Sequence, residues 1–180
     1  MPDVPDVPDV PDALEDDAPF GPHSAPYLRG PHAPVQREIT VDTVHDELTI
    51  VGEVPRDLHG VYLRNGPNAR FAPSGSYHPF DGDGMIHAAH IDGGHVAYRN
   101  RWVQTAGLAE EVAVGHATHS GIMTTLKGRA DLRLKDSANT DVVVHRGHAI
   151  ATWYMSGAPY QLDPITLATL TSSPWHGARP

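Results

Sequence analysis

The residues best suited to chemistry lie in the run Tyr-His-Pro-Phe-Asp-Gly-Asp-Gly-Met-Ile-His, which spans residues 77–87. Carboxylates and glycines alternate there, at Asp81, Gly82, Asp83 and Gly84. Because glycine tolerates positive φ and aspartate favours turns, the alternation predicts a tight turn with positive φ that leads into a strand. Such a loop is typical of a working site and also of an ordinary hairpin connection, so both interpretations stay open.

Asp81 and Asp83 also raise the question of a calcium site of the EF-hand type. That loop needs oxygen ligands at its fifth and twelfth positions, where this sequence has Met85 and Asp92. Methionine does not ligate calcium and aspartate is shorter than the usual bidentate glutamate, so the sequence argues against calcium binding. The sequence also lacks a nucleophile elbow, a phosphate-binding loop and a dinucleotide fingerprint.

Histidine is the other residue type with chemical potential, because the chain has 13 histidines and no cysteine. Three pairs lie three residues apart: His87 with His90, His116 with His119, and His145 with His148. A regular strand would send the first pair to opposite faces, a short helix could bring the second pair to one face, and the third pair flanks a tight turn. No pair completes a metal motif by itself, so surface or turn histidines are favoured, with ligands assembled from distant strands as the alternative.

Composition limits the class of protein further. A chain of 180 residues with 39% hydrophobic content is long enough for one domain with a real core. Its formal net charge of −9 argues against nucleic-acid binding and against attraction to an anionic membrane surface. The absence of cysteine excludes disulfides, zinc–thiolate sites and iron–sulfur clusters. No apolar run is long enough for a transmembrane helix and no signal peptide is recognisable, which predicts a cytoplasmic protein.

The elements that must position these residues follow an unusual N-terminal segment. Residues 2–13 repeat the unit Pro-Asp-Val with a proline at every third position, and proline-rich sequence continues to about residue 30. Proline blocks a helix, and acidic repulsion with few large apolar groups opposes a core. We therefore expect a disordered Pro/Asp-rich tail over residues 1–30, either solvated or serving as a partner-binding arm.

From residue 31 onward, short β-rich runs alternate with turn residues. Strands are expected over residues 35–41, 48–52, 61–68, 85–91, 95–103, 141–145, 148–154, 160–162 and 167–170, and one helix within residues 105–119. In that helix Leu108 and Val112, with Ala109 and Ala113, form the expected apolar face. Successive hairpins without helical crossovers predict an all-β meander, as in a propeller, barrel or sandwich.

The strand pattern stops near the end of the sequence. Residues 171–180 contain two prolines and a glycine and have no strand period. An open meander leaves an exposed edge, which intact β folds close or protect. The sequence therefore predicts a portion of a larger fold over residues 31–170, followed by an aberrant or truncated tail over residues 171–180.

Several ordered blocks resemble the signatures of the carotenoid cleavage oxygenase family. The blocks are Val51–Asn68, Tyr77–His87, Tyr98–Thr105, Lys135–Thr140 and the pair Gly157–Tyr160 and Leu162–Leu170. Their order and spacing extend the resemblance over residues 27–170, which makes it far more specific than any one motif. It implies an all-β chain that forms the N-terminal part, about two blades, of a seven-bladed β-propeller.

The resemblance also implies an activity, the oxidative cleavage of a conjugated carbon–carbon double bond to carbonyl products. In that family a non-haem Fe(II) held by four histidines activates O₂, and an apolar tunnel admits a polyene or stilbene-like molecule. Residues 172–177 stand in place of the motif that carries the first iron histidine, and the other ligands come from later blades. We therefore assign no catalytic residue and no metal ligand, give His176 no ligand role, and expect the 180-residue chain itself to be inactive.

The resemblance assigns substrate and loop roles to a few residues. Lys135 matches a lysine that holds a phenol hydroxyl in stilbene-cleaving relatives, Trp102 occupies the place of its tyrosine partner, and a surface lysine is the alternative for Lys135. The residues expected to shape turns near the working face are Arg64, Asn65, Gly66 and Pro67 in one turn and Asp81, Gly82, Asp83 and Gly84 in the other.

A further departure from the family pattern concerns Tyr154, which stands where relatives often carry a glutamate that orients an iron histidine. A phenol cannot accept a hydrogen bond from the imidazole N–H as a carboxylate does, so the resemblance does not carry this tuning over to Tyr154. The alternative to part of an oxygenase is a non-catalytic β-domain, or an unstable fragment, whose acidic tail serves as an interaction arm.

Overall fold

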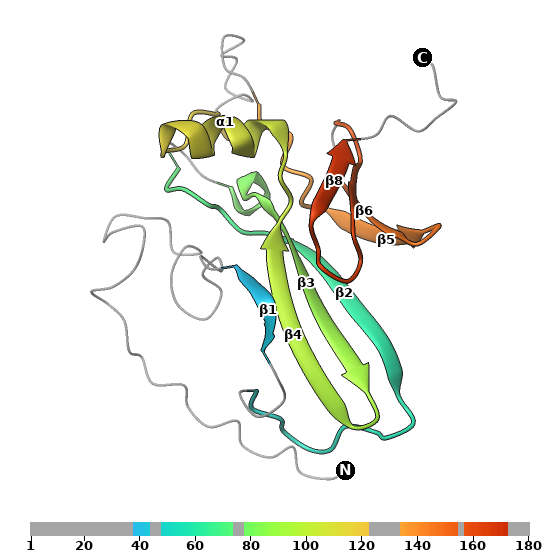
Figure 1. Ribbon diagram of the computed structural model, residues 1–180. Coiled ribbons are helices and arrows are strands. Elements are labelled where there is room, and N and C mark those ends of the chain that lie inside the picture. The colour runs from blue at the N-terminus through green and yellow to red at the C-terminus, as the bar shows by residue number, and fades with distance from the viewer. Residues whose placement is uncertain (1–37, 44–47, 74–77, 123–133, 155–156, 173–180) are drawn as a thin grey trace, which may run out of the picture. The chain divides into compact units, whose positions relative to one another are not determined.

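The computed structural model describes residues 38–43, 48–73, 78–122, 134–154 and 157–172, and the structural statements that follow concern these residues. They form two four-stranded sheets, one α-helix and one short 3-10 helix (Figure 1). The chain divides into two units, Met1–Ala33 and Pro34–Pro180, and the described residues all belong to the second. The tail expected over residues 1–30 lies outside the described residues and stays a prediction, as does the structure of residues 173–180.

The first sheet is antiparallel and has the strand order β1-β4-β3-β2. Its strands are β1 (Ile39–Thr43), β2 (His59–Pro67), β3 (Gly84–Asp92) and β4 (His95–Trp102). The expected hairpin between β3 and β4 is confirmed. Its two loop residues, Gly93 and Gly94, have φ of 57° and 92°, a left-handed backbone that glycine adopts without penalty and that suits the twist of a hairpin.

The second sheet is a plain meander with the order β5-β6-β7-β8. Its strands are β5 (Asp141–His145), β6 (His148–Thr152), β7 (Tyr160–Leu162) and β8 (Thr169–Ser172). Arg146 and Gly147 close the first hairpin with φ of 48° and 80°. Each strand pairs with its successor, which is the arrangement of a propeller blade.

The loop between β7 and β8 explains why the last strand is shifted from its expected position. The carboxylate of Asp163 accepts hydrogen bonds from the backbone N–H groups of Ile165, at 2.9 Å, and Thr166, at 2.7 Å. Leu167 then turns inward with φ of 58°, and its side chain is fully buried. The strand expected over residues 167–170 therefore begins at Thr169 and continues to Ser172, so the first two residues of the expected tail belong to β8.

Helix α1 (Ala106–Val114) lies within the expected residues 105–119, and its ends are defined by single residues. The hydroxyl of Thr105 caps the N-terminus by accepting a hydrogen bond from Leu108 N at 3.1 Å. Gly115 ends the helix in a left-handed conformation with φ of 79°, and its N–H donates to Glu111 O at 2.8 Å. No helix in the described part of the chain has the length and apolar character needed to cross a membrane.

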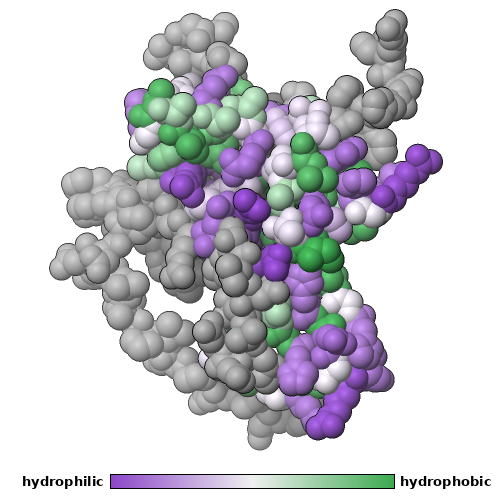
Figure 2. Space-filling model, in the orientation of Figure 1, coloured by the Kyte–Doolittle hydropathy of each residue, from purple (hydrophilic) through white to green (hydrophobic). Residues whose placement is uncertain are grey.

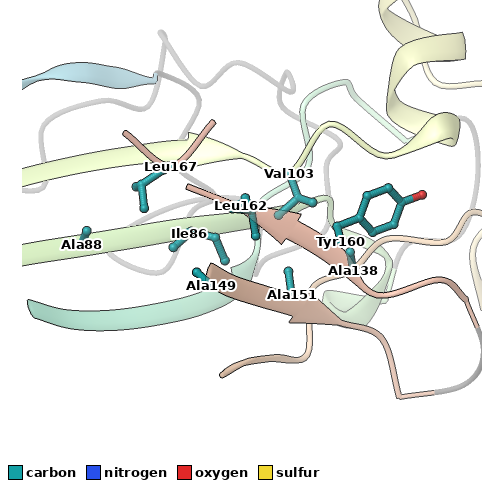
Figure 3. Packing of buried hydrophobic residues seen from close by; sticks show 9 residues of the cluster. All are labelled: Ile86, Ala88, Val103, Ala138, Ala149, Ala151, Tyr160, Leu162 and Leu167. Atoms are coloured by element: carbon teal, nitrogen blue, oxygen red, sulfur yellow. The ribbon is translucent and has the colours of Figure 1, made fainter. Parts of the chain in front are cut away.

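Apolar side chains from both sheets meet in a single cluster, which we call the apolar seam (Figure 3). Its buried members are Ile86, Ala88, Val103, Ala138, Ala149, Ala151, Tyr160, Leu162 and Leu167. The four alanines let the backbones approach closely, while the larger side chains fill the remaining space. A second, smaller cluster joins Met85 and Trp102 of the first sheet to Leu108 of α1.

The strand expected over residues 48–52 is absent; this segment has no regular secondary structure. Gly52 has φ of 93°, outside the β region, and the side chain of Val51 is 86% exposed. A run of β-branched residues without a face to bury gains little from joining a sheet, which is why composition alone misled the prediction.

Candidate functional site

The loop singled out in the sequence forms a compact turn held by its own side chains. Pro79–Asp81 form a 3-10 turn, η4, capped by His78. The N–H of His78 donates to Asp81 Oδ2 at 2.8 Å, and the N–H of Phe80 donates to His78 Nδ1 at 3.2 Å. The other carboxylate oxygen of Asp81 accepts from Ile122 N at 2.8 Å, so Asp81 ties the turn to the segment beyond α1.

The prediction of positive φ in this loop is wrong, and close backbone packing replaces it as the reason for glycine. Gly82 has φ of −63°, and the left-handed glycines of the described chain do not include Gly84. Gly84 instead packs directly against the segment that carries Ser137 and Ala138. Its N–H donates a hydrogen bond to Ser137 O at 2.8 Å. A Cβ at residue 84 would lie 2.8 Å from the same oxygen and closer still to the carbonyl oxygen of Ala138, so a side chain cannot fit.

Asp83 and Lys135 are brought together, although the sequence placed them in different roles. The Lys135 ammonium lies 2.8 Å from Asp83 Oδ1 and 2.7 Å from Glu111 Oε2. Its side chain is only 11% exposed, so the alternative of a surface lysine is wrong. Burial alone would lower the pKa of Lys135, but the two carboxylates outweigh it and raise the pKa above its usual value. The ammonium therefore stays charged.

Glu111 is the main functional-site residue that the sequence did not predict. Its Oε1 accepts hydrogen bonds from the backbone N–H groups of Thr118, at 3.0 Å, and His119, at 3.2 Å, and lies 3.3 Å from His119 Nδ1. Burial alone would raise the pKa of Glu111, but Lys135 and these N–H groups together lower it. We call the group of Asp83, Glu111, His119 and Lys135 the ionic cluster.

The ionic cluster also explains why only Leu108 of the apolar face predicted for α1 is buried. The helix buries Leu108 and Glu111, whereas Val112 is 50% exposed and Ala109 and Ala113 are exposed. Figure 2 shows apolar side chains gathered on the visible outer surface at α1. Glu111 is buried in the helix because its carboxylate pairs with the Lys135 ammonium. The spacing of apolar residues within the helix does not reveal such a partner.

Trp102, assigned with Lys135 to substrate binding, has partners of its own. The side chain is 1% exposed, and the indole N–H donates to Asn68 O at 2.9 Å. The ring packs in the cluster with Met85 and Leu108, and the guanidinium of Arg70 lies 4.3 Å from the ring centroid. A substrate role for Trp102 stays a proposal, but its single donor is already engaged.

The turn expected at Arg64–Pro67 is wrong, because these residues continue β2 in register with β3. Asn65 instead reaches the other sheet, where its Nδ2 donates to Ala138 O at 2.8 Å and to Asp141 O at 3.0 Å. Asn139 makes the reciprocal contact and donates to Phe80 O at 2.7 Å and Gly82 O at 2.6 Å. Each sheet thus orders a loop of the other.

A further polar cluster surrounds His87 on β3. Its Nδ1 lies 2.6 Å from the hydroxyl of Tyr98, to which Asn100 Nδ2 donates at 3.3 Å. Its Nε2 makes a weak 3.4 Å contact with Asn68 Nδ2. Burial, reinforced by the Arg64 guanidinium, lowers the pKa of His87 to about 4, so the imidazole is neutral at pH 7.

The three histidine pairs fare differently. His87 and His90 occupy opposite faces of the regular strand β3, as predicted. His145 and His148 are register partners that flank the β5–β6 turn, also as predicted. The prediction that His116 and His119 share one face of the helix is wrong, because α1 ends before both residues.

Metal binding is not supported by the part of the chain that the structure describes. Within those ranges, no group of three or more histidine, aspartate or glutamate side chains could hold a metal ion. Tyr154, which the resemblance places where relatives often carry an orienting glutamate, is 52% exposed and packs edge to face with Phe80 at 5.9 Å between ring centroids. The described residues therefore do not fit the family's iron.

Comparison with known proteins places this geometry in a family. Residues 32–179 match the family described as retinal pigment epithelial membrane protein, and the matched range runs past Leu170, where the sequence pattern was expected to end. The chain belongs to this family. Its members include the carotenoid cleavage oxygenases that the sequence blocks resemble.

Two curated relatives and one solved structure show the likeness. The apocarotenoid-15,15'-oxygenase of Synechocystis sp. is 36% identical over 129 residues, which cover 67% of this chain and 26% of the relative. The isoeugenol monooxygenase of Pseudomonas nitroreducens is 34% identical over 126 residues, 68% of this chain and 26% of the relative. The lignostilbene dioxygenase of Pseudomonas brassicacearum superposes with a TM-score of 0.69 at 27% identity, over 83% of this chain and 31% of that one.

These comparisons show the architecture to which the two sheets belong. The two sheets form part of the family's propeller. The chain spans about a quarter of the length of the curated relatives it matches, 26% of each of the first two. The activity of a whole protein of this kind is therefore a matter for proposal.

Proposed function

We propose that a protein containing these residues together with the rest of the propeller is an iron(II)-dependent dioxygenase. It cleaves a conjugated carbon–carbon double bond of an apocarotenoid or stilbene-like molecule and gives two carbonyl products. The proposal rests on the match of residues 32–179 to one family, whose similar members include an apocarotenoid-15,15'-oxygenase and a lignostilbene dioxygenase. Both atoms of O₂ enter the products, one at each carbon of the broken bond.

The iron of this proposal is not held by the residues described here. Iron would supply the activation of O₂, and its histidine ligands would come from other blades. We assign no step of the reaction to the two sheets themselves.

We propose that these residues hold two loops in fixed positions and offer a hydrogen-bond donor to the substrate. The apolar seam and the two asparagine contacts hold the loops at Phe80–Gly82 and Ala138–Asp141 in fixed positions. Lys135 offers a charged, nearly buried donor next to those loops. A buried donor of fixed position favours substrates that carry an oxygen at the matching place.

The test uses the protein with its remaining blades, loaded with Fe(II) and supplied with ¹⁸O₂. An apocarotenal, resveratrol and isoeugenol are the probes, and mass spectrometry of promptly reduced products measures the label. We expect ¹⁸O in both products of at least one probe, and no cleavage or stoichiometric iron in the 180-residue chain alone. Failure of the iron-loaded protein to cleave any conjugated probe would reject the proposed function, and cleavage by the short chain would reject the division of labour.

A further inference from the structure

One of the asparagines that join the two sheets lies in a chemically reactive pair, Asn65 and Gly66. The chain has four asparagines, and Asn65 is the only one that is followed by glycine. In such a pair the backbone nitrogen of the glycine can attack the carbonyl carbon of the asparagine side chain, because glycine has no Cβ to crowd the approach. The other three asparagines precede Ala69, Arg101 and Thr140, whose side chains hinder the same attack. Asn65 is therefore the asparagine whose local sequence most favours deamidation.

This reaction needs no reagent other than water. A bond forms between Gly66 N and Asn65 Cγ, the bond between Cγ and Nδ2 breaks, and the proton of the Gly66 N–H leaves with the amide nitrogen as ammonia. Water then adds to one of the two carbonyl carbons of the cyclic imide and opens it to an aspartyl or an isoaspartyl residue. The net change replaces an amide by a carboxylic acid, which is ionised at neutral pH.

The folded structure opposes the first step at both ends of the Asn65 amide. Nδ2, the group that must leave, donates to Ala138 O at 2.8 Å and to Asp141 O at 3.0 Å. Oδ1 is buried and has no hydrogen-bond donor among the described residues. Attack by Gly66 N would place a negative charge on this oxygen, and without a donor or water that charge is not stabilised. The contact with the second sheet therefore protects the reactive pair.

The products of deamidation could not restore the contact that Asn65 makes. A carboxylate at residue 65 has no N–H, and it would face the carbonyl oxygens of Ala138 and Asp141, which are also acceptors. An isoaspartyl residue would in addition lengthen the backbone of β2, which pairs residue by residue with β3 from His59 to Pro67. Modification at this site would therefore prevent the same contact from forming again.

We propose that Asn65 is a deamidation site that the contact between the two sheets keeps unreactive, and that it reacts in molecules in which this contact has opened. Opening releases Nδ2 from its two acceptors and gives water access to Oδ1. The product then marks the opened molecule permanently, because it lacks the donors that closed the contact. This inference is independent of the proposed oxygenase activity.

The test incubates the 180-residue chain in native buffer and in denaturing guanidinium, at one neutral pH and one temperature. Mass spectrometry of the tryptic peptide of residues 65–70 measures deamidation at Asn65, and Asn68 in the same peptide is the internal reference. We expect Asn65 to deamidate at least about a hundredfold faster in the denatured chain than in the folded chain, and faster than Asn68 in the denatured chain. Similar rates at Asn65 in both states, or an unreactive Asn65 in the denatured chain, would overturn the inference.

Two substitutions separate protection by this contact from protection by the fold as a whole. Asn139→Ala removes two hydrogen bonds to the loop before β3 and loosens the segment whose carbonyl groups hold Asn65. Asn100→Ala, the matched control, removes a similarly buried asparagine on β4. We expect Asn139→Ala to raise the deamidation rate of the folded chain about tenfold, and Asn100→Ala to raise it less for the same loss of stability. Rates that follow the loss of stability equally in both variants would count against the proposal.

A mimic of the product provides an answer that does not depend on the folding of the Asn139→Ala variant. Asn65→Asp introduces the carboxylate of the aspartyl product, whereas Asn65→Ala removes the same two hydrogen bonds without adding a charge. We expect Asn65→Asp to unfold at a lower urea concentration than Asn65→Ala, because its carboxylate is held against two carbonyl oxygens. Complete loss of the folded state in Asn65→Asp alone is the extreme of this result. An Asn65→Asp variant no less stable than Asn65→Ala would show that the product fits the contact and would overturn the inference.

Discussion

The apolar seam and the ionic cluster are both buried, but they hold the chain together by different means. The seam is made of residues from strands of both sheets and from the loops that adjoin them, and four of its members are alanines. The ionic cluster joins the start of β3, helix α1 and the segment before β5 through Asp83, Glu111 and Lys135. Burying apolar surface needs only approximate shape, whereas buried charges need partners at hydrogen-bond distance.

This difference teaches where change is tolerated. A substitution in the seam costs the transfer energy of the lost atoms and the cavity left behind, and neighbouring side chains relax around it. Removing Lys135 from the ionic cluster leaves two buried carboxylates without the ammonium that they share. The seam is therefore a graded source of stability, and the ionic cluster depends most on Lys135.

The largest effect is expected at Gly84, which borders both regions. Gly84→Ala places a methyl group 2.8 Å from Ser137 O, and the strand must move away from the segment that carries Ala138 and Lys135. We expect the free energy of unfolding to fall by about 3 kcal/mol or more, measured by urea unfolding of the 180-residue chain. Gly66→Ala on the neighbouring strand meets only the flexible end of Arg64 at 3.3 Å and is expected to cost less than about 1 kcal/mol. Equal losses in the two variants would contradict the close approach at Gly84.

The seam itself is tested by truncating one large member. Leu162 is fully buried, so Leu162→Ala is expected to lower the free energy of unfolding by about 3 kcal/mol. Leu170 on β8 is 53% exposed, and Leu170→Ala is expected to change it by no more than about 0.5 kcal/mol. Unfolding followed by tryptophan fluorescence provides both values. A loss at Leu170 as large as that at Leu162 would mean that the packing of the second sheet is misjudged.

His87 sharpens the comparison, because it is a largely buried titratable group without a counter-charge. Its pKa is lowered from 6.5 to about 4, so the unfolded chain binds more protons than the folded chain between these values. The resulting stability is fully present above pH 6.5 and is lost as the pH falls toward about 4. Because the imidazole is partly exposed and screened, we expect a loss of about 1 kcal/mol over this window. The difference between wild type and His87→Gln, taken across the pH series, isolates it, and parallel curves would contradict the assignment.

Much of the fold could be predicted from the sequence because its hairpins are marked by glycine-containing turns. Asp92-Gly93-Gly94 and Arg146-Gly147 separate β-rich runs, and the strands lie where those turns place them. The strand predicted over residues 48–52 is wrong because a β-branched composition does not show whether a partner strand is present. Helix α1 ends at Val114 because Gly115 takes a left-handed conformation, the C-cap that glycine commonly provides.

The site was less accessible, because its contacts join residues far apart in the chain. Asp83 and Lys135 were each singled out, but their ion pair depends on how the two sheets meet, and Glu111 gave no local signal at all. Glu111 is buried together with Leu108, so the buried face of α1 shares only Leu108 with the predicted face. The positive φ predicted for the glycines of the Asp-Gly-Asp-Gly run is wrong, and the requirement for glycine at Gly84 comes from a segment more than fifty residues away in sequence, around Ala138.

The paired asparagines have a consequence for exchanging parts between relatives. Asn65 holds carbonyl groups of the second sheet, and Asn139 holds carbonyl groups of the loop that precedes β3. A recombination crossover placed between Asn65 and Asn139 would combine the contacts of one asparagine from this protein with the corresponding segment of a relative. Functional hybrids of these oxygenases are therefore expected to inherit the whole interval from one parent.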